Sequence, residues 1–353
     1  MQPILNLNTS EIATWLTEHG QPKYRAKQIE RWIYQRRVQS FEEMTDLPQA
    51  LRSELAAHFE LWTTKIIHDP EATDGTQKLL LQLHDGQSIE CVLIKEGARR
   101  TVCMSTQVGC GMGCVFCASG LDGVARNLTT GEMFEQLLCL QHKLAEDERL
   151  THVVVMGMGE PLANLNQLLP VLNRVSSPEG FGISARRITV STVGLPKAIH
   201  RLADLQVPYH LAISLHAPND ELRDELVKMN QRTGMDAILD AADHFFEVTG
   251  RRVTFEYVLL AGKNDRPEHA QELAKRLRGK NILVNLIPYN PVAGLPYQTP
   301  RVDDTERFQN VLTQYGVQVQ VRKRKGDRID AACGQLRRNR EQQIVTLSKP
   351  KRV

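Results

Sequence analysis

The spacing of apolar residues divides the chain into two regions that meet near residue 100. In the first region, apolar residues recur every three or four positions, as they do along one face of an α-helix. This pattern predicts a helix that Ser10 caps, a second helix over Tyr24–Gln35, and one or two more between Phe41 and Phe59. The first region is therefore expected to be a small helical unit.

A β-hairpin is predicted between the two regions. Lys78–Leu83 and Ser88–Ile94 are short segments with strand-like composition, and they flank Asp85-Gly86. An Asp-Gly pair between two such segments is typical of a tight hairpin turn, because glycine accepts the positive φ that the turn requires.

From Thr101 onward, strand-like segments alternate with helix-like segments. The predicted strands are Thr101–Gln107, His152–Met156, Arg187–Val190, His210–Ser214, Val253–Leu260, Ile282–Ile287 and Val317–Arg322. The predicted helices between most of them are Thr130–Leu144, Asn166–Val175, Leu195–Leu205, Met235–Val248, Glu268–Leu277 and Asp303–Tyr315. This alternation predicts an α/β fold with a parallel sheet and outer helices. Six or seven units are fewer than the eight of a closed barrel, so we expect an incomplete barrel.

Polar or otherwise unusual residues come directly after several predicted strands. They are Cys110, Gly159, Glu160, Ser191, Ser214, His216, Asn290 and Cys333. Because the carboxyl ends of parallel strands form one rim, where α/β folds bind ligands, we expect these residues to face a single cavity.

Basic residues concentrate in two stretches, although the formal net charge is only +3. Between Gln21 and Ser40, six residues are basic and only Glu30 is acidic, and from Arg322 to Val353 eleven Lys or Arg accompany three acidic residues. Two basic stretches around a mixed middle suit a polyanion such as RNA. A solvated helix face and a frayed tail explain the same charges equally well.

Neither a signal peptide nor a membrane span is expected. The first residues lack a basic segment followed by an apolar one, and no apolar run approaches the roughly 20 residues that cross a bilayer. We therefore expect a cytoplasmic protein with no membrane partner. In that compartment, crowded cysteines indicate metal binding rather than structural disulfides.

Three of the seven cysteines form the motif Cys110-Gly-Met-Gly-Cys114-Val-Phe-Cys117. Thiolates are strong ligands for iron–sulfur clusters and for zinc, and the glycines let a loop wrap around a cluster. Three thiolates would leave one iron of a four-iron cluster free to bind a substrate. A zinc ion with a fourth ligand from elsewhere in the chain is the alternative for this spacing.

A CxxxCxxC motif after the first strand of a partial barrel resembles the signature of the radical S-adenosylmethionine (SAM) superfamily. Five further segments closely resemble its RlmN/Cfr group of RNA adenine methyltransferases: Met156–Asn166, Ile188–Gly194, Ala212–Asp220, Asn285–Pro291 and Gly326–Leu336. The resemblance runs from about Tyr24 to Leu336. It implies an incomplete (β/α)6-type radical SAM barrel at 101–336, an RNA-binding helical accessory domain at 1–75, a hairpin linker at 76–100 and a basic tail at 337–353.

The resemblance also implies roles for individual residues. Cys110, Cys114 and Cys117 would bind a [4Fe–4S] cluster, whose free iron would chelate SAM. The residues implied to contact SAM are Gly159, Glu160, Ser191, Ser214, Leu215, His216 and Asn290. Taken without the resemblance, the glycines around Glu160 could form an ordinary turn, and His216 is more often a structural histidine.

Methylation of adenine at C2 requires further groups, because this carbon is a poor nucleophile for direct transfer from SAM. The resemblance implies that Cys333 carries a methyl group from a first SAM, and that a second SAM supplies the radical. It further implies that Glu90 removes the ring proton and that Cys103 attacks Cys333, which leaves a transient disulfide. Without the resemblance, Cys103 could be a core residue and Glu90 a solvated carboxylate on an alternating strand. Cys91 and Cys139 are expected in the core.

The expected substrates are an adenosine of 23S rRNA at the peptidyl-transferase centre and the tRNA adenosine 3′ of the anticodon. A sister activity of the group methylates C8 of the rRNA adenosine and confers antibiotic resistance, and the motifs do not separate the two. A radical SAM enzyme that acts on another substrate, and a zinc-binding RNA protein, are the remaining alternatives. The mechanism implies an electron donor such as flavodoxin or ferredoxin with its reductase, and we expect a monomer.

Overall fold

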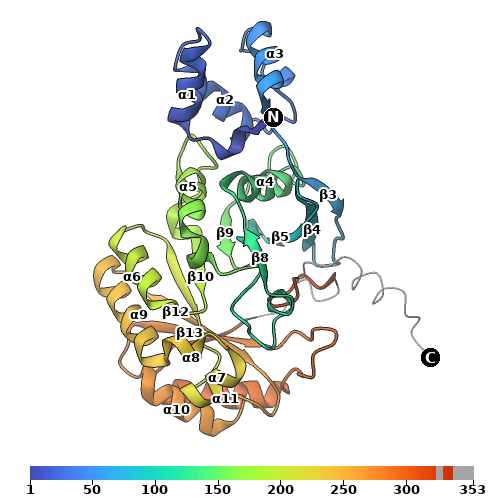
Figure 1. The fold of residues 1–353 in the computed structure, drawn as a ribbon. Coiled ribbons are helices and arrows are strands. Elements are labelled where there is room, and N and C mark those ends of the chain that lie inside the picture. The colour runs from blue at the N-terminus through green and yellow to red at the C-terminus, as the bar shows by residue number, and fades with distance from the viewer. Residues whose placement is uncertain (323–328, 337–353) are drawn as a thin grey trace, which may run out of the picture.

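The structure is a computed structural model that describes residues 1–322 and 329–336. The predicted tail at 337–353 and the basic residues just after Arg322 lie outside the described residues. In Figure 1, a helical N-terminal part lies at one end of the molecule, and the larger α/β part extends from it. Within the described residues, no helix is long and apolar enough to cross a membrane.

Three helices form the N-terminal part, as the sequence predicted. They are α1 (Thr9–Glu18), α2 (Arg25–Tyr34) and α3 (Gln49–His58). The predicted cap of α1 is wrong, because Asn8 and not Ser10 is the N-cap. The Asn8 side chain accepts hydrogen bonds from the amides of Ser10 and Glu11, and the Glu11 carboxylate accepts one from the Asn8 amide, which completes a capping box.

The central feature of the α/β part is a ten-stranded sheet, counted over the described residues. One side is antiparallel and contains the predicted hairpin, which extends the sheet. Its strands are β3 (Lys65–His68), β4 (Gln77–Gln82), β5 (Ser88–Glu96) and β6 (Arg99–Cys103). The other side continues from β6 in parallel through β9 (His152–Val155), β10 (Ile188–Thr192), β11 (His210–Ser214), β12 (Val253–Leu259), β13 (Ile282–Pro288) and β14 (Val319–Val321).

Helices connect the parallel strands, and the sheet does not close on itself, which confirms the incomplete barrel. The long helices are α4 (Thr130–Gln141), α5 (Leu165–Ser176), α6 (Pro196–Asp204), α9 (Met235–Thr249), α10 (Pro267–Leu277) and α11 (Val302–Gln314). Two short helices, α7 (Asp220–Leu226) and α8 (Asn230–Thr233), follow β11. Each long helix matches a predicted helix to within a few residues.

The predicted strand Thr101–Gln107 is divided in the structure. Strand β6 ends at Cys103, and β7 (Gln107–Gly109) pairs with β8 (Val124–Asn127) in a separate two-stranded ribbon. Between them, the amide of Thr106 donates to the carbonyl of Met158, away from the β6 register. The chain therefore leaves the sheet before it reaches the cysteine motif.

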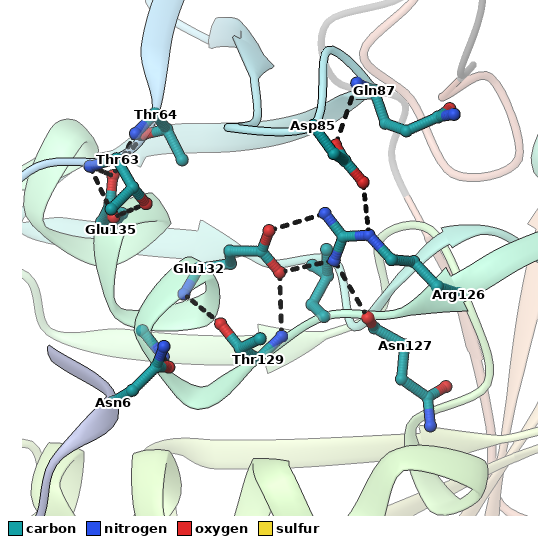
Figure 2. A network of polar contacts seen from close by, with 12 residues as sticks. Asn6, Thr63, Thr64, Asp85, Gln87, Arg126, Asn127, Thr129, Glu132 and Glu135 are labelled. Atoms are coloured by element: carbon teal, nitrogen blue, oxygen red, sulfur yellow. Dashed lines mark hydrogen bonds and ion pairs between the residues drawn. The ribbon is translucent and has the colours of Figure 1, made fainter. Parts of the chain in front are cut away.

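Helix α4 joins the N-terminal part to the sheet, and all of its residues are buried. The Asn6 side chain accepts a 2.7 Å hydrogen bond from the amide of Gly131 at the start of α4. Beyond its other end, the Arg37 guanidinium donates to the carbonyls of Gln141, Ala145 and Glu148. In the middle, Glu135 accepts hydrogen bonds from the amides and hydroxyls of Thr63 and Thr64 (Figure 2).

The Asn6 and Arg37 contacts each satisfy a backbone group in an end turn of α4, whose N-cap is Thr129. Arg37 belongs to the basic stretch that the sequence predicts to bind RNA. Its guanidinium instead holds the two parts of the protein together.

Candidate functional site

One cavity at the carboxyl end of the parallel strands collects most of the predicted site residues. Cys110, Cys114, Cys117, Gly159, Glu160, Ser191, Ser214, His216, Asn290 and Cys333 all line it. These residues lie at or after the ends of six different strands. The expectation that they face one cavity is therefore confirmed. Leu215 is the one predicted SAM-contacting residue that does not line the cavity.

The three-cysteine loop leaves and re-enters the fold through the β7–β8 ribbon. Gly109 at its base has a φ of +77°, and a Cβ there would lie 2.0 Å from the carbonyl oxygen of Gly123, so only glycine fits. On the other side, the amide of Val115 donates 3.1 Å to the carbonyl of Leu226, at the end of α7. The loop is therefore held from two sides.

Burial of the three thiols disfavours their free thiolate forms. It raises the pKa of Cys110 to about 12, and it raises the pKa of Cys114 and Cys117 above the usual thiol value. A bound metal reverses this effect, because it holds each sulfur as a thiolate. Three soft ligands in an apolar loop therefore fit an iron–sulfur cluster.

Gly159 and Glu160 form a turn after β9 that faces the cysteine loop. Gly159 has a φ of +104°, and a Cβ there would clash with Gln107 at 2.6 Å. Glu160 accepts hydrogen bonds from the amides of Val193 at 2.7 Å and Leu162 at 3.0 Å. Burial nevertheless raises the pKa of Glu160 to about 7.

His216 lies in the cavity wall in a constrained conformation. Its φ is +63°, and its Nδ1 accepts a 3.0 Å hydrogen bond from the amide of Val258. Burial, together with Arg223, lowers the pKa of His216 to about 3, so the neutral imidazole carries its proton on Nε2. Phe116 packs edge-on against the ring at 4.9 Å.

Ser191 and Ser214 line the cavity from β10 and β11. The Ser191 hydroxyl donates 2.6 Å to the carbonyl of Val155. Leu215 is fully buried beneath the wall, and its carbonyl accepts from the Arg223 guanidinium at 3.0 Å. Leu215 therefore supports the neighbouring residues of this segment.

The loop that carries Cys333 packs directly on the cysteine loop. The amide of Ala118 donates 2.8 Å to the carbonyl of Gly334, and the Ser119 hydroxyl donates 2.8 Å to the carbonyl of Leu336. Asn290 approaches from the barrel, where its Nδ2 lies 3.4 Å from the Cys333 carbonyl. Its buried Oδ1 has no hydrogen-bond partner among the described residues.

A second, smaller cavity brings Cys103 and Cys333 together, with Arg322 in the same wall. Burial raises the pKa of Cys103 to about 12, although Arg322 partly opposes the shift. Proximity to Cys333, and a hydrogen bond with it, raises the pKa of Arg322 above its usual value. The two thiols predicted to form a transient disulfide thus share a cavity with one guanidinium.

Glu90 does not lie where a solvated carboxylate would. It is fully buried on β5 and pairs with the equally buried Lys78 at 2.8 Å. The alternative of a solvated carboxylate is therefore wrong, because the segment that carries Asp330 contacts Lys78 on the same face of the sheet. Glu90 lines neither of the two cavities described above. Cys91 and Cys139 are buried, as expected.

Two charged residues of the cavity were not predicted as site residues. Glu256 on β12 and Arg322 after β14 both line the main cavity, and burial raises the pKa of Glu256. Asn285 donates 2.8 Å to the Glu256 carboxylate. A carboxylate in the middle of an otherwise apolar buried strand is a signal that could have identified Glu256 from the sequence.

A network of polar contacts supports the cysteine loop from outside the cavity (Figure 2). Arg126, on the strand that leaves the loop, pairs with both oxygens of Glu132 at 2.7 and 2.8 Å. Its Nε lies 2.7 Å from Asp85 in the hairpin turn. Arg126 lowers the pKa of Asp85 through this hydrogen bond. The network ties the loop to the hairpin and to the start of α4.

Comparison with known proteins identifies the family. Residues 2–61 match the family described as ribosomal RNA large subunit methyltransferase N-terminal domain, and residues 104–276 match the radical SAM superfamily. The chain is 57% identical over 337 residues to a probable dual-specificity RNA methyltransferase RlmN of Rhodopirellula baltica. The aligned region covers 96% of this chain and 91% of the relative. Its identity with the protein of the same name in Bacillus subtilis is 45% over 341 residues, or 96% and 94% of the two chains.

A solved structure supports the same assignment. The crystal structure of a radical SAM methyltransferase from Sphaerobacter thermophilus superposes with a TM-score of 0.92 at 43% identity, and the match covers 96% of this chain and 99% of that one. The chain therefore belongs to the RlmN family of radical SAM RNA methyltransferases.

Proposed function

We propose that the protein methylates C2 of an adenosine in 23S rRNA at the peptidyl-transferase centre, and also the tRNA adenosine 3′ of the anticodon. The carrying observation is the hydrogen bond from Ala118, next to Cys117, to Gly334, next to Cys333. It holds the proposed methyl carrier beside the proposed cluster. The names of relatives that span nearly the whole chain support RNA as the substrate class.

Cys110, Cys114 and Cys117 would hold a [4Fe–4S] cluster and leave one iron for SAM. When bound, this cluster supplies the electron that cleaves SAM to methionine and a 5′-deoxyadenosyl radical. The SAM-binding residues would be Gly159, Glu160, Ser191, Ser214, Leu215, His216 and Asn290, with Leu215 acting from beneath the wall. The unpartnered Oδ1 of Asn290 suits an amino group such as that of adenine.

Cys333 would receive its methyl group by displacement from a first SAM. Its thiolate forms a bond to the methyl carbon while the sulfonium–methyl bond breaks, and S-adenosylhomocysteine leaves. Arg322 supports this role, because its guanidinium forms a hydrogen bond with the Cys333 side chain. Two SAM molecules are then consumed per turnover, one as methyl donor and one as radical source.

Release of the product would need Glu90 and Cys103. Hydrogen abstraction from the Cys333 methyl group would let its carbon add to the adenine ring, which would join Cys333 to the RNA through an S–CH2 bond. Glu90 would accept the proton of the ring carbon, and the adduct would return one electron to its donor. The Cys103 sulfur would bond to the Cys333 sulfur as the S–CH2 bond breaks, the pair from that bond would take up a proton to complete the methyl group, and a transient disulfide would remain. The shared cavity of the two cysteines supports this pairing. A thioredoxin-like protein would reduce the disulfide and restore the two thiols. A flavodoxin or ferredoxin with its reductase would supply electrons to the cluster. We propose that the protein acts as a monomer.

Anaerobic incubation of the reconstituted protein with SAM and an rRNA fragment tests the proposal. 2-Methyladenosine and 5′-deoxyadenosine should appear together, and both should vanish for Cys114→Ala. Mass spectrometry against authentic isomers separates C2 from C8 methylation. 8-Methyladenosine as the product, or a colourless protein with zinc and no iron, would overturn the proposal.

A further inference from the structure

Lys78 is a buried lysine whose side chain reaches two groups of the proposed mechanism. Its Nζ lies 2.8 Å from Oε1 of Glu90. The same Nζ donates a 3.2 Å hydrogen bond to the carbonyl of Asp330, in the segment that leads to Cys333. The side chains of Lys78 and Glu90 are 4% and 0% exposed, so water does not hydrate either charge.

The register of the sheet places these groups on one face. Lys78 on β4 lies opposite Val92 on β5, and Cys103 on β6 lies opposite Val92 from the other side. Residues that oppose each other in antiparallel strands project to the same face, and so do residues two apart on one strand. Lys78, Glu90 and Cys103 therefore share the face of the sheet that covers the Cys333 segment.

Stability alone is a poor explanation for this pair. Two charges lose their hydration on burial, and a buried ion pair is often no more stabilising than a well-packed apolar pair. The contact with Asp330 adds a feature that a structural pair does not need. One ammonium group connects the proposed base to the segment that carries the methylated thiol.

We propose that Lys78 is a positioning residue that fixes Glu90 relative to the Cys333 segment for removal of the ring proton. This inference rests on the proposed function. In the step concerned, the C–H bond of the ring carbon breaks, the proton passes to a Glu90 oxygen, and the bonding pair stays on the ring. Lys78 contacts neither RNA nor SAM in this scheme and acts only through Glu90 and the Asp330 carbonyl.

The test follows separate steps of the reaction in Lys78→Met. Methylation of Cys333 precedes the proton transfer, so its rate should stay within about twofold of the unaltered protein. Formation of methylated RNA should fall about 100-fold, the order of loss that misplacement of a catalytic group causes. A covalent complex between Cys333 and RNA should accumulate and be visible by denaturing electrophoresis. Lys78→Arg should restore part of the product.

Lys95→Met is the matched control. Lys95 also lies on this antiparallel part of the sheet and pairs with Glu71 at 3.5 Å, but this pair is partly exposed. Its loss should change neither product nor complex. If Lys78→Met loses Cys333 methylation and RNA methylation equally, Lys78 has a merely structural role and the inference is overturned. A normal rate of RNA methylation in Lys78→Met would also overturn it.

Lys78→Met leaves the buried Glu90 carboxylate without its ion-pair partner, and this variant could fail to fold for that reason. Combining Lys78→Met with Glu90→Gln removes the charge and avoids the problem. Glu90→Gln alone should trap the covalent complex, and adding Lys78→Met should not lower its yield. A lower yield in the double variant contradicts the inference. If Glu90→Gln traps no complex and Cys333→Ala retains activity, the proposed function itself fails, and the two failures are thereby separated.

Discussion

Cys103 and Cys333 line one small cavity, Cys103 from the end of strand β6 and Cys333 from a segment near the other end of the chain. Burial raises the pKa of Cys103 to about 12, so this thiol stays protonated at neutral pH. A protonated thiol is a weak nucleophile, because the thiolate is the attacking form. Cys103 therefore lies in the same cavity as Cys333 and is mainly in its less reactive, protonated form at neutral pH.

Cys103→Ala should leave the first half of the reaction intact and block the last step. We expect normal methylation of Cys333, no release of methylated RNA, and a stable covalent complex of the protein with RNA. Mass spectrometry of the Cys333 peptide and denaturing electrophoresis measure the two halves. Cys139→Ala, which removes a buried cysteine from α4 outside both cavities, should behave as the unaltered protein. Multiple turnovers by Cys103→Ala would exclude the disulfide step.

Arg322→Met should slow the methylation of Cys333. A hydrogen bond to a charged group contributes about 1.5–3 kcal/mol, which corresponds to a loss of roughly 10- to 100-fold in the rate at neutral pH. Mass spectrometry of the Cys333 peptide over time, with SAM and without RNA, measures the rate of methylation. Arg252→Met serves as control, because Arg252 pairs with Gln318 at the opposite end of the barrel. An unchanged rate in Arg322→Met would show that Cys333 is activated by other groups.

The sequence alone predicted the architecture and many of the residues that line the main cavity. The periodicity of apolar residues is a local signal that locates each strand and helix. Because the carboxyl ends of parallel strands meet at one rim, the residues that follow the strands can be assigned to a common site. That rule placed Glu160, Ser191 and Asn290 in one cavity correctly. The interruption after Cys103 was missed, because it depends on the contact between Thr106 and Met158, which are distant in sequence.

Charged residues were the least predictable part of the site. Glu90 alternates with apolar neighbours and has the pattern of a solvated carboxylate, yet it is buried and pairs with Lys78. Arg37 has the pattern of an RNA-binding residue, yet it binds carbonyls at the end of α4. In both cases the deciding partner comes from another element, and periodicity does not report such partners.

The exposed face of α2 should contribute to RNA binding. Lys27 and Arg31 are exposed, one turn apart on this helix, and neither has an ion-pair partner among the described residues. Lys27→Glu with Arg31→Glu should weaken RNA binding and reduce the slope of log K against log salt by about 1 to 2. Filter binding over a range of salt measures both.

The control for this surface reverses two charges elsewhere. Lys275→Glu with Arg278→Glu alters the exposed end of α10, on the part of the barrel distant from α2 (Figure 1). It should leave affinity and salt dependence unchanged. If both double variants lose affinity equally, the effect comes from net charge and not from the α2 face.

His216 should make the protein less stable in mild acid. Burial lowers the pKa of its imidazole to about 3, whereas an unfolded chain protonates histidine near pH 6.5. Between these two values the unfolded state binds one more proton than the folded state, so the free energy of unfolding rises with pH by up to about 1.4 kcal/mol per unit. The contribution is complete above pH 6.5 and is lost as the pH falls. Anaerobic urea unfolding measures the free energy of unfolding at pH 7 and at pH 5. The difference between these two values should be smaller for His216→Gln than for the unaltered protein. His84→Gln, at an exposed histidine, should show the same difference as the unaltered protein. Equal differences in all three proteins would mean that the buried imidazole takes up its proton in the folded state.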